Sequence, residues 1–215
     1  MFKIAIDGPA GSGKSTISKI LASMLHFDHI DTGAMYRAIT LKALRLGINL
    51  EDEAQYGFLS TTKIDLDGDK IYLDGEDVSV AIRSVEVTTN ASTPARLAVV
   101  RTALVDLQRQ IAKKQNVIMD GRDIGSVVLP DADLKIYLDA SPECRAIRRM
   151  KEREASGIKK SFEETLEEIM VRDRKDSTRA ISPLKVADGA IVIDTSDMTI
   201  DEVVSKIIAL VNEGK

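Results

Sequence analysis

Hydrophobic and polar positions follow one another along this chain in a pattern that predicts strands alternating with helices. Short apolar runs typical of buried strands lie at residues 2–6, 27–30, 116–120, 134–139 and 190–194. Between them, apolar residues recur every three or four positions, as on one face of an α-helix. The clearest such stripes are Ile17, Ile20, Leu21, Met24 and Leu25; Met35, Ile39, Leu41, Ala43, Leu44 and Leu46; and Ile200, Val203, Val204, Ile207, Ile208 and Val211. This alternation predicts a parallel sheet with helices on both faces.

The alternation stops between about residues 60 and 90. Two short segments, 62–66 and 70–74, flank the sequence Asp67-Gly68-Asp69, which is typical of a β-hairpin turn. We expect a small antiparallel insertion beside the main sheet, with a long surface loop as the alternative.

Several helix ends carry capping signals. Thr93-Pro94 predicts the start of a strong helix whose buried stripe includes Leu97, Val100, Leu104, Leu107 and Ile111. Ser141-Pro142 begins a later helix, Ser161 with Glu164 and Thr199 with Glu202 form capping boxes, and Gly47 ends a helix. Residues 155–160 read as a flexible break between two helices.

The composition is that of an ordinary globular domain. The chain has 215 residues, of which 44% are hydrophobic and 30% charged, and its formal net charge is -4. That charge argues against binding to a nucleic-acid polymer or to a membrane surface. Cys144 is the single cysteine, which suits a reducing compartment, and no apolar run is long enough to span a bilayer. We therefore expect a cytoplasmic protein, and we expect it to be a monomer.

Directly after the first predicted strand comes Gly8-Pro9-Ala10-Gly11-Ser12-Gly13-Lys14-Ser15. This matches the phosphate-binding loop, in which glycines let backbone N–H groups point at phosphate oxygens and the following helix directs its positive end at the same anion. In that pattern Lys14 reaches the β- and γ-phosphates, and the hydroxyl of Ser15 binds Mg²⁺. The loop has the strand before it and the helix after it that the motif requires.

The rest of the chain narrows the range of nucleotide-binding proteins. The Asn-Lys-x-Asp motif of GTP-dependent switches is absent from the sequence. Five cations gather in residues 145–153, namely Arg145, Arg148, Arg149, Lys151 and Arg153. Phosphoryl transfer between two nucleotides brings about six negative charges together, and Mg²⁺ cancels two of them. The cluster therefore predicts a lid that closes on phosphates, with a solvated helix face as the alternative.

Four segments taken together resemble the bacterial cytidylate kinase family. They are the loop at residues 8–15, Asp31-Thr32-Gly33-Ala34-Met35-Tyr36-Arg37, Asp120-Gly121-Arg122-Asp123-Ile124-Gly125 and Arg172-Asp173-Arg174-Lys175-Asp176-Ser177-Thr178-Arg179. The likeness runs nearly end to end and includes the expected hairpin. It implies a P-loop NTPase fold with a five-stranded parallel sheet, an antiparallel insertion beside the site of the nucleoside monophosphate, and a helical lid.

The resemblance also implies boundaries within a single kinase domain that spans residues 1–215. The core would comprise residues 1–59, 94–145 and 180–215, the insertion about 60–93 and the lid about 146–162. The implied reaction is transfer of the γ-phosphoryl group of ATP to CMP or dCMP, with Mg²⁺ as the cofactor.

Roles for individual residues follow from the same resemblance. The phosphates of ATP would lie against Gly8, Pro9, Ala10, Gly11, Ser12, Gly13, Lys14, Ser15 and Thr16. CMP would contact Thr32, Arg37, Ser92, Arg101, Arg122, Asp123, Arg172, Asp176 and Arg179. Lys14, Arg122, Arg179, Arg148 and Arg149 would carry catalysis. Ser15 would bind Mg²⁺, and Asp120 would either hold its water ligands or serve as a turn-capping residue.

The implied reading of the base can be checked against cytosine itself. Cytosine presents an amino donor at N4 and acceptors at N3 and O2, so Asp123 can accept from N4 while Arg101 donates to the acceptors. Uracil reverses the pattern at positions 3 and 4 and leaves a buried carboxylate facing a carbonyl oxygen. Asp123 is therefore expected to distinguish CMP from UMP.

Two other hypotheses remain open on the sequence alone. One is a P-loop kinase for another small acceptor, such as UMP, shikimate or dephospho-coenzyme A. The other is a nucleotide-dependent switch or binding module with no acceptor. His26 and His29 form no metal-binding pair and receive no role, and Cys144 is expected to be a packing residue.

Overall fold

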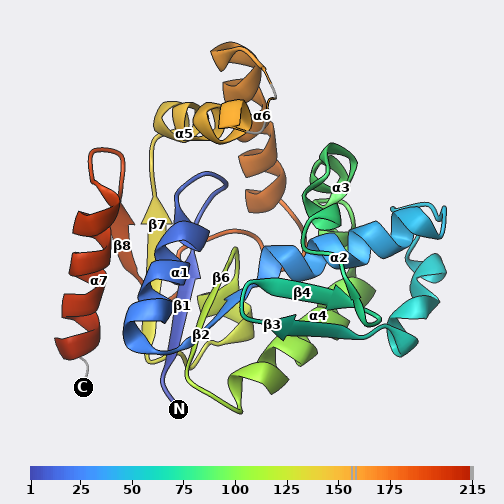
Figure 1. Ribbon diagram of the computed structural model, residues 1–215, viewed down its shortest axis with the longest axis horizontal. Coiled ribbons are helices and arrows are strands. Elements are labelled where there is room, and N and C mark those ends of the chain that lie inside the picture. Colours follow the sequence, from blue (N-terminus) through green and yellow to red (C-terminus); the bar gives the residue numbers. More distant parts are fainter. Residues whose placement is uncertain (156, 158, 214–215) are drawn as a thin grey trace.

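The structure is a computed structural model, and it describes residues 1–155, 157 and 159–213. At its centre is a parallel sheet of five strands in the order β2-β6-β1-β7-β8 (Figure 1). The strands are β1 (Lys3–Asp7), β2 (Asp28–Asp31), β6 (Val117–Gly121), β7 (Leu134–Asp139) and β8 (Ile191–Asp194). The predicted parallel sheet is confirmed, and each strand lies within about one residue of its predicted bounds.

Helices cover both faces of this sheet because successive residues of each strand point to opposite sides. On one face, Ile4 and Ile6 pack in a cluster with α1 (Lys14–Leu25) and α7 (Ile200–Glu213). On the other face, Ala5 belongs to a cluster with α2 (Thr32–Arg45) and α4 (Ala98–Ala112). The residues of both clusters are buried, so the two faces of the sheet form the core of the molecule.

The predicted hairpin is also confirmed. Strands β3 (Ile64–Asp67) and β4 (Lys70–Leu73) pair antiparallel, with Asp67 opposite Lys70. Gly68 has a φ of 55°, which a two-residue turn between paired strands requires. A short third strand, β5 (Glu76–Asp77), and the short helices η1 (Glu53–Thr61), η2 (Ala81–Arg83) and α3 (Val85–Asn90) accompany the hairpin. The pattern of hydrophobic residues gave no signal for β5.

The helix expected to start at Thr93-Pro94 begins later than predicted. Pro94 instead starts a single 3₁₀ turn, η3 (Pro94–Arg96), and Thr93 makes no side-chain cap. The α-helix α4 starts at Ala98, behind Leu97, whose backbone is extended. Val100 and Leu104 of the predicted stripe are fully buried in the core. The Thr-Pro signal was correct for a helical turn but wrong for the start of the α-helix.

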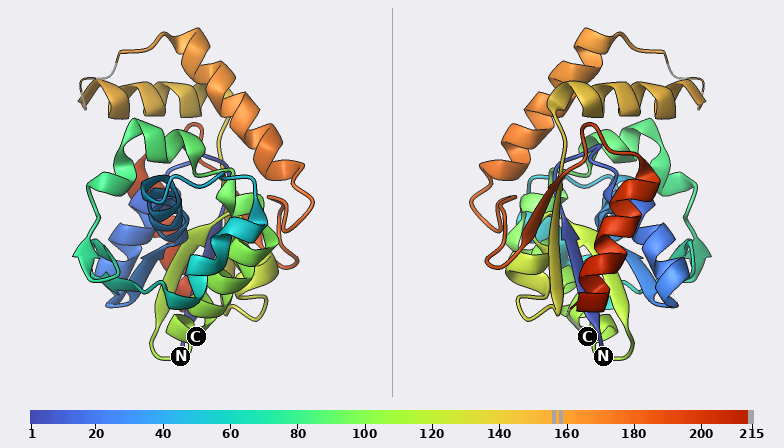
Figure 2. Two further views of the ribbon diagram at one scale, coloured as in Figure 1. Left: turned by 90° about the vertical axis from the view of Figure 1, so that its right-hand side faces the viewer. Right: turned by 90° about the vertical axis from the view of Figure 1, so that its left-hand side faces the viewer.

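Two helices, α5 (Pro142–Ala155) and α6 (Phe162–Ser177), lie across the carboxyl end of the sheet (Figures 1 and 2). Ser141 accepts a hydrogen bond from the backbone N–H of Cys144, and Ser161 and Glu164 form the predicted capping box. The predicted break at residues 155–160 includes positions 156 and 158, which lie outside the described residues. Among the described residues, no helix is long and apolar enough to cross a bilayer.

Candidate active site

The phosphate-binding loop joins β1 to α1 in a conformation that only glycine can adopt at its first position. Gly8 has a φ of 149°, and a Cβ atom there would lie 2.0 Å from the backbone oxygen of Leu138. Gly13 has a φ of 89° and precedes the first turn of α1. The motif residues therefore form a tight turn at the amino end of a helix, as the sequence predicts.

Lys14 lies inside this loop. Its Nζ donates hydrogen bonds to the backbone oxygen of Pro9, at 2.6 Å, and to Oγ of Ser12, at 3.3 Å. Burial lowers the pKa of Lys14 well below its usual value, and the nearby charge of Arg122 acts in the same direction. A buried ammonium group held mainly by a carbonyl is poised to exchange that partner for an anion.

Asp120, at the end of β6, connects three elements around the loop. Its Oδ2 accepts a hydrogen bond from the hydroxyl of Ser15, at 2.7 Å. Its Oδ1 lies 2.6 Å from Nε2 of His29, and its backbone oxygen accepts from the hydroxyl of Thr32, at 2.8 Å. Asp120 thus joins the phosphate loop to β2 and to the start of α2. The Asp120 carboxylate contacts the side chains of Ser15 and His29, and neither of these contacts is the turn cap that the sequence also allowed.

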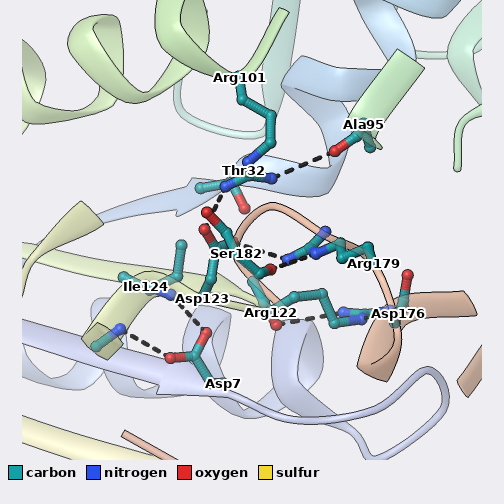
Figure 3. Close-up of polar contacts among 12 residues, drawn as sticks. Asp7, Thr32, Ala95, Arg101, Arg122, Asp123, Ile124, Asp176, Arg179 and Ser182 are labelled. Carbon is teal, nitrogen blue, oxygen red and sulfur yellow. Dashed lines mark hydrogen bonds and ion pairs between the residues drawn. The ribbon is translucent and has the colours of Figure 1, made fainter. Parts of the chain in front are cut away.

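Asp7, the last residue of β1, connects the phosphate loop to the segment that directly follows the Gly-Arg-Asp turn, which consists of Gly121, Arg122 and Asp123. Its two carboxylate oxygens accept the backbone N–H groups of Ile124 and Gly125, each at 2.8 Å (Figure 3). These residues open η4 (Ile124–Val128), a short π-helix that sequence reasoning did not foresee. Burial raises the pKa of Asp7 to about 6, although the two backbone bonds act in the opposite direction.

Two arginines from distant segments meet at Asp123. Arg101, from α4, pairs with one carboxylate oxygen, and Arg179, which follows α6, lies 3.3 Å from the other (Figure 3). All three residues are buried. The guanidinium group of Arg101 also lies 5.7 Å from the ring centre of Tyr36. The structure therefore assembles three residues of the predicted CMP site into one buried network.

A second group of charges lies beside this network. Nε of Arg122 donates to Asp176, at 2.9 Å, and burial together with neighbouring arginines lowers the pKa of Arg172 to about 10. Asp31 caps α2 by accepting from the N–H of Ala34 and pairs with Arg37 at 2.9 Å. The Nε atoms of Arg37 and Arg172 are buried and have no hydrogen-bond partner within the part of the chain that the structure describes. A buried guanidinium N–H without a partner is unusual in a folded protein, and such a donor is available to a bound anion.

The cations of α5 face in different directions. Arg145 is buried, where it donates to the backbone oxygens of Ala140 and Ala10 and pairs with Asp173 of α6. Arg148 donates to the hydroxyl and the backbone oxygen of Thr195. Arg149 pairs with Glu152 and lies close enough to Arg172 to lower its pKa.

Not all of the five form a phosphate-facing surface. Arg153 pairs with Glu168 of α6, and Lys151 is exposed. Arg145 holds the phosphate loop to α5 and α6. Of the five cations, Arg149 therefore has the clearest electrostatic connection to the arginines of the site.

The positions of Ser92 and Thr16, the remaining predicted site residues, say little about their roles. Ser92 is half-buried in the turn between α3 and η3, and Thr16 is exposed on the first turn of α1. Neither belongs to the hydrogen-bonded networks around Asp120 and Asp123. Their predicted roles depend on contacts with ligands and stay predictions.

Comparison with known proteins identifies the family. The family model for cytidylate kinase matches residues 4–213, which is almost the whole chain. The chain belongs to the cytidylate kinase family. It is 54% identical over 206 residues to the cytidylate kinase of Caldanaerobacter subterraneus, with 95% of this chain and 92% of that protein covered. It is 50% identical over 214 residues to the cytidylate kinase of Acholeplasma laidlawii, with 100% and 96% covered.

Solved structures support the P-loop kinase fold of this chain. A shikimate kinase from Bacteroides thetaiotaomicron superposes with a TM-score of 0.51 and 14% identity, covering 98% of each chain. An uncharacterized protein from Eubacterium ventriosum gives a TM-score of 0.54, also at 14% identity, with 99% of each chain covered. At this level of identity the likeness concerns the fold alone, and it confirms the predicted class.

Sequence reasoning missed three residues that organise the site. Asp7 and Asp31 each stand at the end of a predicted strand, where side chains of a parallel sheet converge, and that position is a usable signal. His29 is different because a lone histidine carries no such signal. Its contact with Asp120 depends on the alignment of β2 with β6, which the sequence does not specify.

Proposed function

We propose that this member of the family transfers the γ-phosphoryl group of ATP to CMP or dCMP and releases ADP and CDP or dCDP. ATP would lie against residues 8–16, and CMP would occupy the region between α2, the Gly-Arg-Asp turn and the end of α6. We further propose that one chain forms the complete site and works as a monomer in the cytoplasm. Sedimentation of the purified protein tests the monomer.

The observation that carries the proposal is the gathering of cations from separate elements. Lys14 and Arg122 interact electrostatically, and each of them also interacts with Arg172. Arg37 and Arg149 act on Arg172 in the same way. Five cations thus converge from the phosphate loop, α2, the Gly-Arg-Asp turn, α5 and α6. This cluster matches the charge of a triphosphate beside a monophosphate.

The network around Asp123 supports cytosine as the base. A buried carboxylate can accept from an exocyclic amino group, while Arg101 supplies donors for ring acceptors. Asp176, on the last turns of α6, lies within reach of Arg172 and Arg122 and would hold the sugar hydroxyls together with Arg172. Thr32, Arg37 and Ser92 would complete the contacts with CMP.

The residues present also fit a magnesium ion. Ser15 and Asp120 are hard oxygen donors at the loop, and Mg²⁺ is usually held by one or two such groups together with nucleotide phosphates. Within the described residues, no group of three or more His, Cys, Asp or Glu side chains could hold a metal by itself. Ser15 would bind the ion directly and Asp120 through water. The ion would supply charge that stabilises the transferring phosphoryl group.

No general base is needed for this reaction because the acceptor phosphate is already ionised. Catalysis would come from positioning and from charge stabilisation. Lys14, Arg122, Arg179, Arg148 and Arg149 would follow the phosphoryl oxygens as charge develops on them. The lid, expected at about residues 146–162, would exclude water and so limit hydrolysis of ATP.

A panel of acceptors tests the function. ADP release would be measured by a coupled assay with ATP and one acceptor at a time: CMP, dCMP, UMP, shikimate or dephospho-coenzyme A. We expect kcat/KM to be highest for CMP or dCMP. A higher value for another acceptor would show a different P-loop kinase, and ADP release that does not depend on any acceptor would favour a switch.

A further inference from the structure

His29 lies on the edge strand of the sheet, next to the phosphate loop. Strand β2 pairs with β6 so that His29 stands opposite Ile118, two residues before Asp120. Ile118 belongs to the core cluster on the α1 side of the sheet. The His29 ring contacts Asp120, which accepts the hydroxyl of Ser15 at the start of α1. The side chains of His29 and Asp120 are only 11% and 4% exposed.

The contact between His29 and Asp120 fixes the orientation of the Asp120 carboxylate. Nε2 of His29 lies 2.6 Å from Oδ1 of Asp120. When Asp120 accepts this bond as a carboxylate, which has no hydrogen to donate, Nε2 of His29 is the donor. The other oxygen, Oδ2, is then turned toward Ser15, whose hydroxyl donates to it at 2.7 Å. A hydroxyl that donates a hydrogen bond to a carboxylate keeps its oxygen lone pairs free for another partner.

The order of the three groups excludes a nucleophilic serine. In hydrolases of the Ser-His-Asp type, the imidazole stands between the hydroxyl and the carboxylate so that it can take the serine proton. Here the carboxylate of Asp120 stands in the middle, between Ser15 and His29. The arrangement can therefore orient the hydroxyl but cannot activate it by proton transfer to the ring.

We propose that His29 is a positioning residue for the metal-binding side of the active site. It holds Asp120 so that its second carboxylate oxygen stays beside the hydroxyl of Ser15, where Ser15 would bind the magnesium ion directly and Asp120 through water. The inference rests on the proposed function, since it assigns His29 a role in the same reaction. Partners that orient metal-binding side chains typically change metal affinity about 10- to 100-fold when removed.

The experiment compares two variants of His29 with a matched control. His29→Phe keeps the size of the ring and removes the donor. His29→Gln restores an N–H donor near the position of Nε2. The control is His26→Asn at the only other histidine, which is exposed at the end of α1 with a φ of 56° that asparagine tolerates.

The first measurement is the magnesium dependence of the rate at saturating nucleotides. We expect His29→Phe to raise the Mg²⁺ concentration for half-maximal rate about tenfold or more, with kcat at saturating Mg²⁺ much less affected. His29→Gln should stay within about threefold of the unmodified protein because its donor replaces Nε2. His26→Asn should not change the value. A purely structural role would lower kcat or the unfolding temperature and leave the metal dependence unchanged.

The second measurement does not depend on turnover. Binding of Mn²⁺ to the ADP complex, followed by electron paramagnetic resonance, should be about tenfold weaker in His29→Phe and normal in the other two variants. Equal Mn²⁺ affinity in all four proteins would overturn the inference. Failure of the unmodified protein to phosphorylate CMP would instead overturn the proposed function and leave this measurement decisive for His29.

A third measurement covers the case in which His29→Phe does not fold. In unmodified protein labelled with ¹⁵N-histidine, the two rings give separate signals, which His26→Asn assigns. We expect the His29 ring to be protonated at Nε2 and its signal to move when Mg²⁺ is added to the ADP complex. A ring without that proton, or a signal that does not respond to Mg²⁺, would contradict the role.

Discussion

Arg101 and Asp123 form an ion pair that is closed to solvent, with side chains only 4% and 6% exposed. Arg101 comes from α4 and Asp123 from the turn after β6, and Arg179 approaches the second carboxylate oxygen. Two charged groups are expensive to remove from water, so a buried pair of this kind is weak support for stability by itself. The position of this Arg101–Asp123 pair at a candidate ligand site instead agrees with a role in recognising a polar base.

The variant Asp123→Asn tests recognition of the base. The amide can donate to O4 of uracil, where the carboxylate would face an acceptor, so the variant should narrow the ratio of kcat/KM for CMP to that for UMP. We expect the ratio to change by about 5- to 150-fold, since a mismatched buried polar group costs about 1–3 kcal/mol. Steady-state kinetics with both acceptors checks this.

The ratio also corrects for any loss of stability. Asp123→Asn leaves two buried arginines with less negative charge and should lower the free energy of unfolding by up to about 3 kcal/mol. Such a loss affects both acceptors equally, so an unchanged ratio in folded protein would show that Asp123 does not read the base.

Arg172 should favour ligand binding at the expense of stability. Burial and the charges of Arg122, Arg149 and Arg37 all lower its pKa, and Asp176 compensates only in part. Replacing it by Met should raise the free energy of unfolding without ligand by about 1–3 kcal/mol, because a pKa lowered to about 10 reflects a charge that the fold disfavours. The same variant should raise KM for CMP at least about tenfold, as expected for a lost charge-assisted hydrogen bond.

Urea unfolding with and without CMP separates the two effects for Arg172→Met. We expect the ligand-free variant to unfold at higher urea than the unmodified protein, and CMP to stabilise it less. A ligand-free variant that is less stable, together with unchanged stabilisation by CMP, would show that Arg172 is an ordinary packing residue.

Lys14 should be essential for turnover and dispensable for folding. Its ammonium group is buried, and its partners in the loop are a carbonyl and a hydroxyl. Removing it by Lys14→Ala should lower kcat by about a hundredfold or more, the usual cost of losing a group that stabilises transition-state charge. Far-ultraviolet circular dichroism and the unfolding temperature should stay near those of the unmodified protein. A variant with full activity would contradict the assignment of the loop.

The sequence was sufficient for the frame of the molecule but not for its polar contacts. Strand ends and the phosphate loop follow from local patterns, because apolar periodicity and glycine spacing are properties of neighbouring residues. The meeting of Arg101 with Asp123 joins residues 22 positions apart, and Arg179 joins from a further 56 positions away. The family resemblance, and not periodicity, was what grouped those three residues. His29 was missed because its role depends on strand register.

The surroundings of the α5 arginines in the expected lid also could not be predicted from the sequence. Sequence spacing placed Arg145, Arg148 and Arg149 on one helix, and that is correct. Which of them is buried depends on what packs against each side of α5. Arg145 faces the phosphate loop and α6, so it is held by Ala10 and Asp173. No local pattern distinguishes it from its neighbours.

Asp7 should make stability depend on pH between about 4 and 6. Burial raises its pKa from 3.8 to about 6. The folded protein then binds a proton in a range where the unfolded chain has lost it, so the contribution of Asp7 is complete below about pH 4. It disappears as pH rises through about 6, and the total change is up to about 3 kcal/mol for a shift of this size.

Asp7→Asn isolates this contribution because an amide does not titrate in that range. The free energy of unfolding would be measured in urea at pH 4, 5, 6 and 7 for both proteins. We expect the difference between unmodified protein and variant to fall from pH 4 to pH 6 and then to level off. The other carboxylates affect both proteins alike. Parallel curves would mean that Asp7 titrates normally in the folded state.

Arg148 and Arg149 are neighbours on α5 with different surroundings, and they form a matched pair for testing the lid. Arg149 acts electrostatically on Arg172, within the cation cluster, whereas Arg148 is held by Thr195 between β8 and α7. We therefore expect Arg149→Ala to lower kcat about a hundredfold, as for the loss of a donor to the transferring group. Arg148→Ala should lower kcat less than Arg149→Ala does and should also raise KM for ATP, because Thr195 lies against the backbone of Ser12 in the phosphate loop. Saturation kinetics in both substrates distinguishes the two effects. If Arg148→Ala gave the larger loss of kcat, the lid would have to rearrange so that Arg148 leaves Thr195 and reaches the phosphoryl group.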